Sequence, residues 1–357
     1  MENASRPILA QRSIKLPAKK YVAGDTLEFN VPSGLVIKEI VISMHGKSYN
    51  EFTVGDFNIH KYGVMDALIR DLNVKDGSKV LKGFKGVDAL RRQARYLNGS
   101  SAPVFYKKNS STLGASPSVG FIDKPAATAQ DFAFSETVSI PFENKLSNQW
   151  ARTLLNTKGK NNVKIEMVFN TLEKLLDRSD STTVIGAQTS DVNIEVSIIT
   201  IPARINMPVV ENWRQTHKTI NINGQQTAQP YELTKGSRVQ GFWISALLGS
   251  ANRRLTLDEA KELVFQVDLN NGSQIKSFSL YDLQMENLAK SPIQVVQDGA
   301  AYCNFLDNSI FETALDTSSG SGVLAYNVLV TTPASWDYTK PLELTIEQDD
   351  IEFLQQI

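Results

Sequence analysis

The second half of this chain repeats the first in outline, and the repeat limits the folds that the chain can adopt. Residues 34–45 (GLVIKEIVISMH) match residues 236–247 (GSRVQGFWISAL) at one constant offset, which aligns glycine with glycine and serine with serine. Residues 73–90 match residues 268–283 in the same way. A Gly-Ser pair falls on a Gly-Ser pair and, after a one-residue gap, Phe falls on Phe and Asp on Asp.

A third echo lies late in each half, where residues 163–169 (VKIEMVF) match residues 342–348 (LELTIEQ). Three echoes in the same order indicate two copies of one β unit of about 150–200 residues, a usual domain size. Two copies are too few for a solenoid, so the repeat predicts a tandem β protein.

The repeat divides the chain into three parts, with a boundary in the proline-containing segment 202–212. We expect a basic N-terminal arm at residues 1–20. A first β unit is expected at residues 21–203 and a second at residues 204–357.

Apolar and polar residues alternate with a period of two along much of the chain, which is typical of half-buried strands. In the run 163–169, Val163, Ile165, Met167 and Phe169 are expected to face the core. The alternating runs are residues 26–31, 37–43, 137–142, 163–169, 193–201, 218–223, 239–245, 262–269, 324–332 and 342–347.

Helical periodicity is sparse, so we expect only short helices inserted between strands. The clearest covers residues 85–98, and the repeat predicts its partner at residues 279–290. Another is expected at residues 256–264, where Thr256 and Glu259 have the spacing of a capping box.

Two segments have the composition of long exposed loops. Residues 98–136 are rich in Ser, Gly and Pro, and residues 177–191 are rich in Ser, Thr and Asp. Loops of this length in a β domain are commonly functional or contact neighbouring molecules.

The composition, 41% hydrophobic and 21% charged residues, is that of a globular protein. No apolar run approaches the ~20 residues of a membrane-spanning helix, and the first residues lack the apolar stretch of a signal peptide. We therefore expect a soluble protein made in a cytoplasm. Its net charge of −1 argues against a sequence-specific nucleic-acid binder.

The sequence contains no recognised catalytic motif: neither a P-loop, a GxGxxG fingerprint, an HExxH helix nor a GxSxG elbow. Two acid pairs, Asp177 with Asp180 and Asp349 with Asp350, are expected to be solvated. Adjacent strand residues point to opposite faces, so the second pair cannot serve one substrate. The single cysteine, Cys303, lies among apolar residues and is expected to be a buried, inert thiol. We expect no enzyme activity.

The three histidines, His45, His60 and His217, do not have the spacing of metal ligands, so we expect no metal and no cofactor. The densest basic cluster covers the clearest helix and the strand before it. A solvated helix face is the default interpretation, and a contact with another subunit or with lipid is the alternative. Its members are Lys79, Lys82, Lys85, Arg91, Arg92 and Arg95.

The two ends of the chain carry opposite charge. The last fifteen residues hold five acids and no base. Either end is a solvated tail, or the basic end faces an anionic surface or a neighbouring subunit's acidic end. The basic residues that we assign to assembly or membrane contact are Arg6, Arg12, Lys15, Lys19 and Lys20.

Two tandem β units, matching inserted helices, long polar loops and the absence of catalytic motifs together resemble the double jelly-roll major capsid proteins of the tectivirus and adenovirus lineage. Residues 26–43 (TLEFNVPSGLVIKEIVIS) look like the start of the first jelly roll in tectivirus-type coats. The resemblance implies an all-β fold of two eight-stranded jelly-roll sandwiches with short inserted helices.

The resemblance also implies a function. The chain would be a structural major coat protein, as in bacteriophages, whose homotrimers form pseudo-hexameric capsomers that tile an icosahedral virion over an internal membrane. Its partners would be further copies of itself, penton or minor capsid proteins and membrane lipid. It would be made and assembled in the host cytoplasm.

Two rival functions stay open at this point. A viral spike or carbohydrate-binding tandem β-sandwich would need an exposed aromatic platform. A glycan-processing jelly-roll hydrolase would need acids facing a cleft and a secretion signal.

Overall fold

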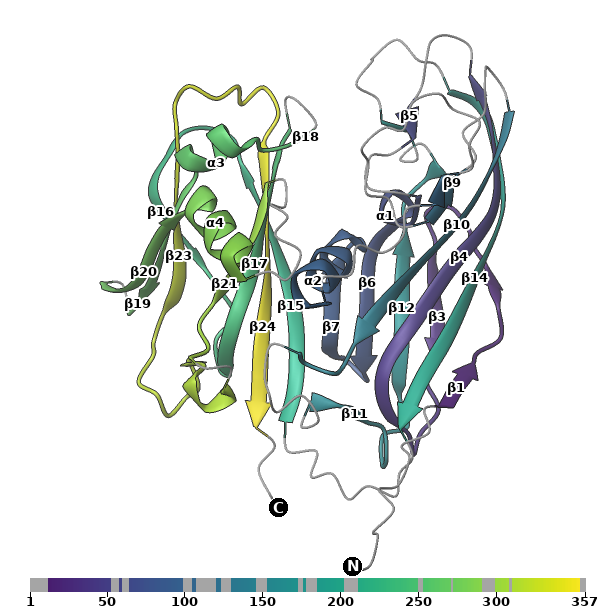
Figure 1. Cartoon of the computed structure of the whole chain (residues 1–357), viewed down its shortest axis with the longest axis horizontal. Coiled ribbons are helices and arrows are strands. Elements are labelled where there is room, and N and C mark those ends of the chain that lie inside the picture. Colours follow the sequence, from purple (N-terminus) through teal and green to yellow (C-terminus); the bar gives the residue numbers. More distant parts are fainter. Residues whose placement is uncertain are drawn as a thin grey trace, which may run out of the picture.

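The structure is a computed structural model that describes residues 12–52, 58–59, 64–98, 105–106, 120–122, 130–145, 153–172, 176–177, 185–201, 211–249, 253–270, 272–290, 299–307 and 310–353. Two β-sandwiches lie side by side, one formed by the N-terminal half and one by the C-terminal half (Figure 1). No helix among these residues is long and apolar enough to cross a lipid bilayer.

The outer sheet of the first sandwich consists of β1 (Arg12–Lys15), β2 (Lys19–Lys20), β4 (Val36–Phe52), β8 (Phe105–Tyr106), β9 (Gly120–Ile122), β10 (Gln130–Pro141), β11 (Leu155–Asn156) and β14 (Ile185–Ile201). Its order is β1-β14-β4-β10-β9-β8, with β2 beside β14 and β11 beside β4. The facing sheet has the order β3-β12-β6-β7. Its strands are β3 (Thr26–Asn30), β6 (Ile69–Asp76), β7 (Lys79–Lys85) and β12 (Val163–Phe169).

The second sandwich repeats this plan. One sheet has β24 between β15 and β17, and β21 flanks β17; the facing sheet has the order β16-β23-β19-β20. The strands are β15 (Glu211–Ile222), β16 (Gln226–Glu232), β17 (Arg238–Leu248), β19 (Val264–Leu269), β20 (Ser273–Ser279), β21 (Ala300–Asn304), β23 (Tyr326–Thr332) and β24 (Leu342–Phe353). The short elements are β5 (Asn58–Ile59) paired with β13 (Leu176–Asp177), then β18 (Arg253–Arg254), β22 (Leu315–Asp316) and the 3-10 helix η3 (Phe311–Thr313).

The repeat found in the sequence corresponds to this shared plan. Strand β4 occupies the place of β17, and the hairpin of β6 and β7 occupies the place of the hairpin of β19 and β20. Gly34 and Gly236 precede the matching strands β4 and β17, and both have positive φ. An L side chain is strained there, which explains why both copies carry glycine.

The third echo is wrong by one strand. Strand β12 pairs with β3 and β6, and the strand with the same neighbours in the second half is β23, which pairs with β16 and β19. Strand β24 instead corresponds to β14, because each is the central partner of the repeated strand, β17 or β4. Alternating strands resemble one another, so similarity in pattern did not identify the topological partner.

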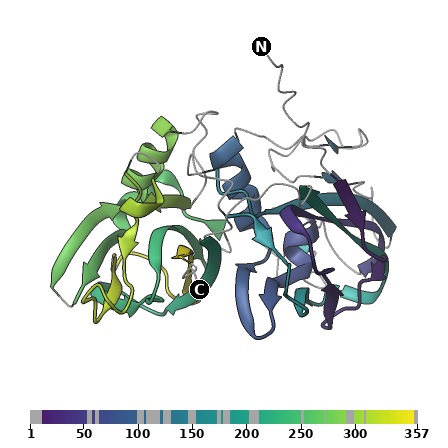
Figure 2. The ribbon, with the colours of Figure 1, turned by 90° about the horizontal axis from the view of Figure 1, so that it is seen from below.

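Alternation produces the two cores as expected. In β12 the residues Val163, Ile165, Met167 and Phe169 are buried, while the residues between them are only half-buried. One cluster of buried apolar side chains spans the first sandwich and a separate cluster spans the second, so each sandwich has its own core. Figure 2 shows the two sandwiches as separate pairs of facing sheets.

Four helices connect strands in the described part of the chain: α1 (Val64–Leu68), α2 (Asp88–Asn98), α3 (Leu257–Glu262) and α4 (Leu280–Lys290). The predicted capping box of α3 is confirmed, because Thr256 Oγ1 accepts from the Glu259 amide and the Glu259 carboxylate accepts from the Thr256 amide. Helices α2 and α4 follow the matching strands β7 and β20, as the repeat predicts. Helix α1 was not predicted, because five residues are too few for a periodic signal.

The expected loops are shorter than predicted. Strand β10 begins at Gln130 and β14 at Ile185, so the ends of segments 98–136 and 177–191 are strands. These strands continue the ladder along the seventeen-residue strand β4, and backbone pairing overrides their polar composition. The segments 107–119, 123–129 and 178–184, which include Asp180, lie outside the described residues.

The N-terminal arm also differs from expectation. Residues 12–15 form β1 and residues 19–20 form β2, and both strands pair with β14. They occupy the edge position that β15 occupies in the second sandwich, so residues 12–20 belong to the first sandwich. Their side chains are mostly exposed, because an edge strand requires backbone pairing more than an apolar core face.

Candidate functional site at the junction of the two sandwiches

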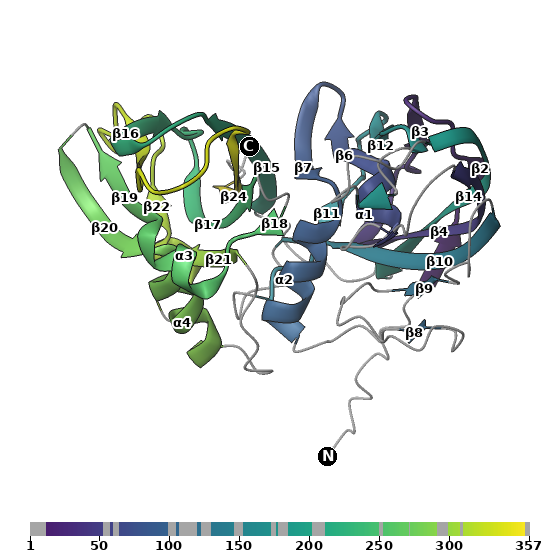
Figure 3. The same ribbon diagram turned by 90° about the horizontal axis from the view of Figure 1, so that it is seen from above.

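The two sandwiches meet where β7 of the first lies parallel to β15 of the second. The two strands share one backbone pair, Gln215 with Lys82. Helix α2 lies above this pair and between the two halves (Figure 3). The helix therefore places its side chains against the face of β17 and β24 that points away from the second core.

A strand-to-helix turn fixes the start of α2. Gly86 has a φ of +71°, and the Asp66 carboxylate accepts hydrogen bonds from the amides of Val87 (3.0 Å) and Asp88 (2.8 Å). This carboxylate satisfies amides that a helix start leaves without partners. The turn moves the start of the helix from the predicted residue 85 to Asp88.

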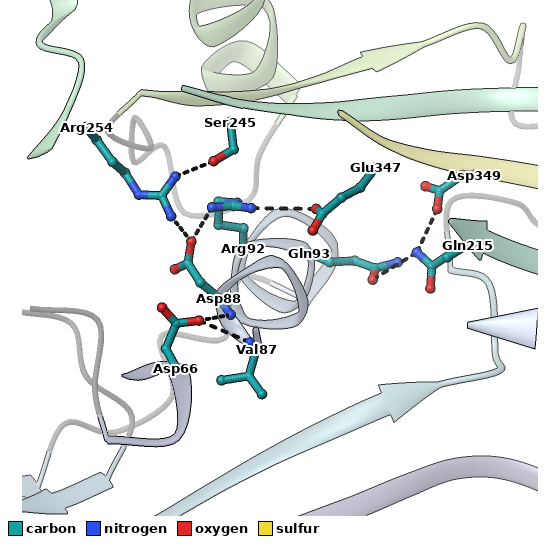
Figure 4. Close-up of polar contacts among 10 residues, drawn as sticks. All are labelled: Asp66, Val87, Asp88, Arg92, Gln93, Gln215, Ser245, Arg254, Glu347 and Asp349. Carbon is teal, nitrogen blue, oxygen red and sulfur yellow. Dashed lines mark hydrogen bonds and ion pairs between the residues drawn. The ribbon is translucent and has the colours of Figure 1, made fainter. Parts of the chain in front are cut away.

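The first turns of α2 carry an ion-pair network into the second sandwich (Figure 4). The Asp88 carboxylate accepts hydrogen bonds from the guanidinium groups of Arg92 and Arg254. Arg254 also donates to Ser245 Oγ of β17 at 2.6 Å. Arg92 lies 3.6 Å from the Glu347 carboxylate of β24. One helix is thus tied to two strands of the other half.

Buried aromatic rings lie next to these charges. Tyr96 of α2 makes an edge contact with Trp243 of β17, with ring centroids 5.4 Å apart. Trp243 in turn packs on Tyr302 of β21 at 5.0 Å. Such rings exclude water from the junction and strengthen the ionic contacts beside them.

A second cluster lies directly at the strand contact. Lys82 Nζ donates to Gln215 Oε1 at 2.9 Å and lies 3.1 Å from the centre of the Trp213 ring. Gln215 Nε2 donates to Asp349 Oδ1 at 2.6 Å and to Gln93 Oε1 of α2 at 3.3 Å. Lys82 is 0% exposed and Asp349 1% exposed, so both charges are removed from solvent.

No family model and no curated protein match this sequence. Solved structures do. The chain is similar to the major capsid protein of Sulfolobus turreted icosahedral virus, with a TM-score of 0.68, 11% identity and coverage of 96% of this chain and 97% of that one. It is also similar to the major capsid protein P2 of bacteriophage PM2, with a TM-score of 0.57, 11% identity and coverage of 98% and 100%. A third similar structure is that of the PBCV-1 virus capsid, with a TM-score of 0.59, 13% identity and coverage of 98% and 95%.

The chain has the double jelly-roll fold. The expected fold class is confirmed, and the likeness extends over both jelly rolls and the junction between them.

The basic cluster of the sequence is not a solvated face of the double jelly roll. Arg91 and Arg92 are each 6% exposed, and Lys82 is fully buried at the junction. Lys85 pairs with Glu343 of β24, and Lys79 Nζ lies 2.6 Å from Glu352 of β24. Neither interpretation holds for the buried residues Lys82, Arg91 and Arg92, whose side chains contact Gln215, Glu136 and Glu347 inside the molecule. Lys79 stays exposed although it pairs with Glu352. The Arg95 side chain lies outside the described residues.

The expectation of solvated acids is wrong for Asp349 and Asp350. Their side chains do point to opposite faces of β24, as alternation requires, but each face is covered. Asp349 meets the first jelly roll, whereas Asp350 accepts from Gln348 Nε2 at 2.7 Å. Burial raises the pKa of both carboxyls to about 6. The acidic composition of residues 343–352 is typical of an exposed segment, so the sequence did not predict that both faces of β24 are buried.

Among the other predicted residues that the structure describes, His217 of β15 lies at the junction, where its Nε2 is 3.9 Å from the Asp71 carboxylate of β6. The rest lie elsewhere. Cys303 is buried in β21, and burial raises the pKa of its thiol to about 12, which agrees with an inert cysteine. His45 lies half-buried in β4, and Asp177 lies in β13. His60 and Arg6 lie outside the described residues. Arg12, Lys15, Lys19 and Lys20 are exposed on β1 and β2.

Glu136 of β10 was not singled out from the sequence. Its fully buried carboxylate accepts from the amides of Val64 (2.6 Å) and Met65 (3.0 Å), which begin α1, and from the guanidinium of Arg91 (2.6 Å). One acid thus joins β10, α1 and α2. Extending the alternation of the predicted strand 137–142 back by one residue would have placed Glu136 on the inward face with Val138 and Ile140, and that is the signal that would have found it.

The junction can hold the two jelly rolls together through buried charged and polar side chains. Among the described residues, no group of three or more His, Cys, Asp or Glu side chains has the arrangement of a metal site. Three acids of β24, Glu343, Glu347 and Glu352, instead pair with basic groups of the first jelly roll.

Burial of Glu347 predicts a specific pH dependence of stability. Burial, with Arg92 opposing it, raises the pKa of this carboxyl from its usual 4.5 to about 7. The folded protein therefore favours the protonated form. The stabilisation that Glu347 contributes is fully present below about pH 4.5. It is lost as the pH rises through 7, and the free energy of unfolding then falls by roughly 2–4 kcal/mol. Urea unfolding of Glu347→Gln should show a smaller fall in stability between these pH values than the wild-type protein.

Glu343→Gln is the matched control for this measurement, because Glu343 lies on the same strand but is partly exposed and pairs with Lys85. Glu343→Gln should keep the wild-type pH dependence of stability, because this variant retains the buried Glu347 carboxyl. Identical slopes for wild type and Glu347→Gln would contradict the assignment.

Proposed function

We propose that this chain is a structural major coat protein of a virus, and that its function is to assemble with copies of itself into an icosahedral shell. The single observation that carries this proposal is the likeness to viral major capsid proteins over 96–98% of this chain and 95–100% of theirs. The match therefore includes both jelly rolls rather than one of them.

The way in which the two jelly rolls join supports a closed ring of copies. Strand β20 of the second jelly roll is the counterpart of β7 in the first. In the same way, β1 of the first jelly roll is the counterpart of β15 in the second. Both β20 and β1 are edge strands with mostly exposed side chains. The contact between β7 and β15 can thus be repeated between β20 of one copy and β1 of the next. Three copies with six jelly rolls would give the pseudo-hexameric capsomer.

We further propose the division into jelly rolls at residues 21–203 and 204–357, with residues 12–20 added to the first as its edge. The exposed basic side chains of Arg12, Lys15, Lys19 and Lys20 would face an anionic surface, either the headgroups of an internal membrane or the acids of a neighbour. Penton and minor capsid proteins of the virion are the further partners, and assembly would take place in the host cytoplasm.

Mass and assembly measurements test this function. Native mass measurement should give a trimer, and electron micrographs of assembled protein should show hexagonal outlines, because the open edges β20 and β1 require partners. A chain that stays monomeric over a wide concentration range and binds a glycan would instead support the spike or carbohydrate-binding alternative.

A separate double variant tests the exposed basic residues of β1. Arg12→Gln with Lys15→Gln should leave the trimer and its thermal midpoint unchanged but reduce particle formation and binding to vesicles that contain anionic lipid. Lys158→Gln with Lys340→Gln removes the same charge from two other exposed positions and should do neither. Equal assembly by both pairs of variants would contradict the role of the basic edge.

A further inference from the structure

The contact between the two jelly rolls contains a lysine in an unusual setting. Lys82 of β7 is fully buried, and no other lysine in the described part of the chain is buried. The Trp213 ring lies against its amino group, and the Phe142 ring centre is 5.7 Å away. The hydrogen-bond partner of the amino group is the side-chain carbonyl oxygen of Gln215, not a carboxylate.

The Gln215 amide is held from both ends. Its carbonyl oxygen accepts from Lys82 at 2.9 Å, and its nitrogen donates to Asp349 at 2.6 Å and to Gln93 at 3.3 Å. The amide therefore has an amine on its carbonyl side and a carboxyl group on its nitrogen side. Figure 4 shows that Asp349 and Gln93 approach the amide from different elements, β24 and α2.

Burial shifts each group toward the protonation state that acyl transfer requires. Burial lowers the pKa of the Lys82 amino group well below its usual range, although Asp349 opposes this. Burial raises the pKa of the Asp349 carboxyl to about 6, and Lys82 opposes that change. A neutral amine is a nucleophile and a protonated carboxyl is a general acid, whereas the charged forms are neither.

We propose that Lys82 and Gln215 form an isopeptide bond that covalently joins the two jelly rolls. The lone pair of Lys82 Nζ adds to Gln215 Cδ, and the bond between Cδ and Nε2 then breaks. The Asp349 carboxyl gives its proton to the departing nitrogen, and the proton lost by Nζ restores the carboxyl. The amine and the amide thus become a secondary amide and one molecule of ammonia, with no oxidant or cofactor.

The arrangement favours this reaction over hydrolysis. The three groups come from β7, β15 and β24, so folding alone brings them together and supplies the proximity that an intermolecular reaction lacks. The surrounding aromatic rings exclude water, which is the competing nucleophile. Other lysines of the first jelly roll, such as Lys75 and Lys160, pair with carboxylates and are partly exposed, so they lie beside neither a side-chain amide carbon nor a water-excluding set of rings.

The mass of the folded full-length protein tests the proposal directly. Loss of one ammonia lowers the intact mass by about 17 Da relative to the sequence. Trypsin cannot then cleave after Lys82, so the digest should contain residues 80–85 joined through a side chain to residues 215–218. An unchanged intact mass would overturn the proposal. So would a lower mass with the two peptides separate, because the ammonia would then have come from elsewhere.

Variants separate the reaction from mere packing. Asp349→Asn keeps the shape of the side chain but removes the proton donor, so the joined peptide pair should fall at least tenfold in a protein that still melts cooperatively. Lys82→Arg keeps a long side chain with N–H donors at the junction but removes the nucleophilic amine, so it should give the full mass expected for its sequence. Lys75→Arg is the matched control on the neighbouring strand and should retain the cross-link. Wild-type yield of the joined pair in Asp349→Asn would exclude Asp349 as the proton donor.

Discussion

Replacing Glu136 with alanine should destabilise the protein by about 4 kcal/mol, because it removes the counter-charge of a buried arginine. The Glu136 carboxylate bonds the Arg91 guanidinium and two amides at the start of α1. All of these groups lie away from solvent, so water cannot replace the lost carboxylate. Urea unfolding followed by circular dichroism measures the loss.

Two further variants show whether burial causes this effect. Asp258→Ala removes an exposed acid that pairs with Lys261 at 2.8 Å, and it should cost less than about 1 kcal/mol. The double variant Glu136→Leu with Arg91→Met removes both buried charges and should recover much of the stability lost in Glu136→Ala. A loss in Glu136→Ala no larger than that in Asp258→Ala would show that the ion pair is not important for the fold.

The second large effect is expected at Gly241, where β17 shifts register against β24. A Cβ atom at this position would overlap the backbone carbonyl oxygen of Cys303 and lie 2.7 Å from the Tyr302 hydroxyl. Because the carbonyl oxygen belongs to a paired strand, it cannot move without breaking the ladder between β17 and β21. Gly241→Ala should therefore cost about 3 kcal/mol, near the upper end of overpacking effects.

Gly224→Ala is the matched control, since a Cβ atom there has no neighbour within 4 Å. Its thermal midpoint should stay close to that of the wild-type protein, while that of Gly241→Ala falls by several degrees. Equal midpoints for the two variants would mean that β21 yields easily, and the rigid packing of β17 against β21 would be contradicted.

A covalent link between Lys82 and Gln215 would restrict the movement of the two jelly rolls relative to each other. The backbone register between them is a single residue pair, and the remaining contacts are side chains on α2 and β24. A bond at that pair would close the chain from β7 to β15 into a loop and restrict separation of the halves. This would suit a coat protein whose two jelly rolls must keep a fixed angle within a shell.

Local patterns in the amino-acid sequence predicted the repeated unit and most of its strands. Alternation in residues 163–169 specified which side chains face the core, since a strand places successive side chains on opposite faces. The repeat in residues 73–90 and 268–283 predicted a helix at matching places in the two halves. Both signals are local, so they do not depend on how the two halves meet. The third echo failed because alternation alone does not distinguish one strand from another.

Which charged residues are buried depends on contacts between distant segments, and local sequence patterns do not show these contacts. Lys82, Arg92 and Asp349 lie in segments whose composition is that of solvated surface, and no local pattern separates them from exposed residues such as Lys158. They are buried because α2 packs on β24 and β7 lies beside β15, contacts between segments more than one hundred residues apart. Burial of a charge depends on the partners that distant segments supply, and these partners exist only once both jelly rolls have folded against each other.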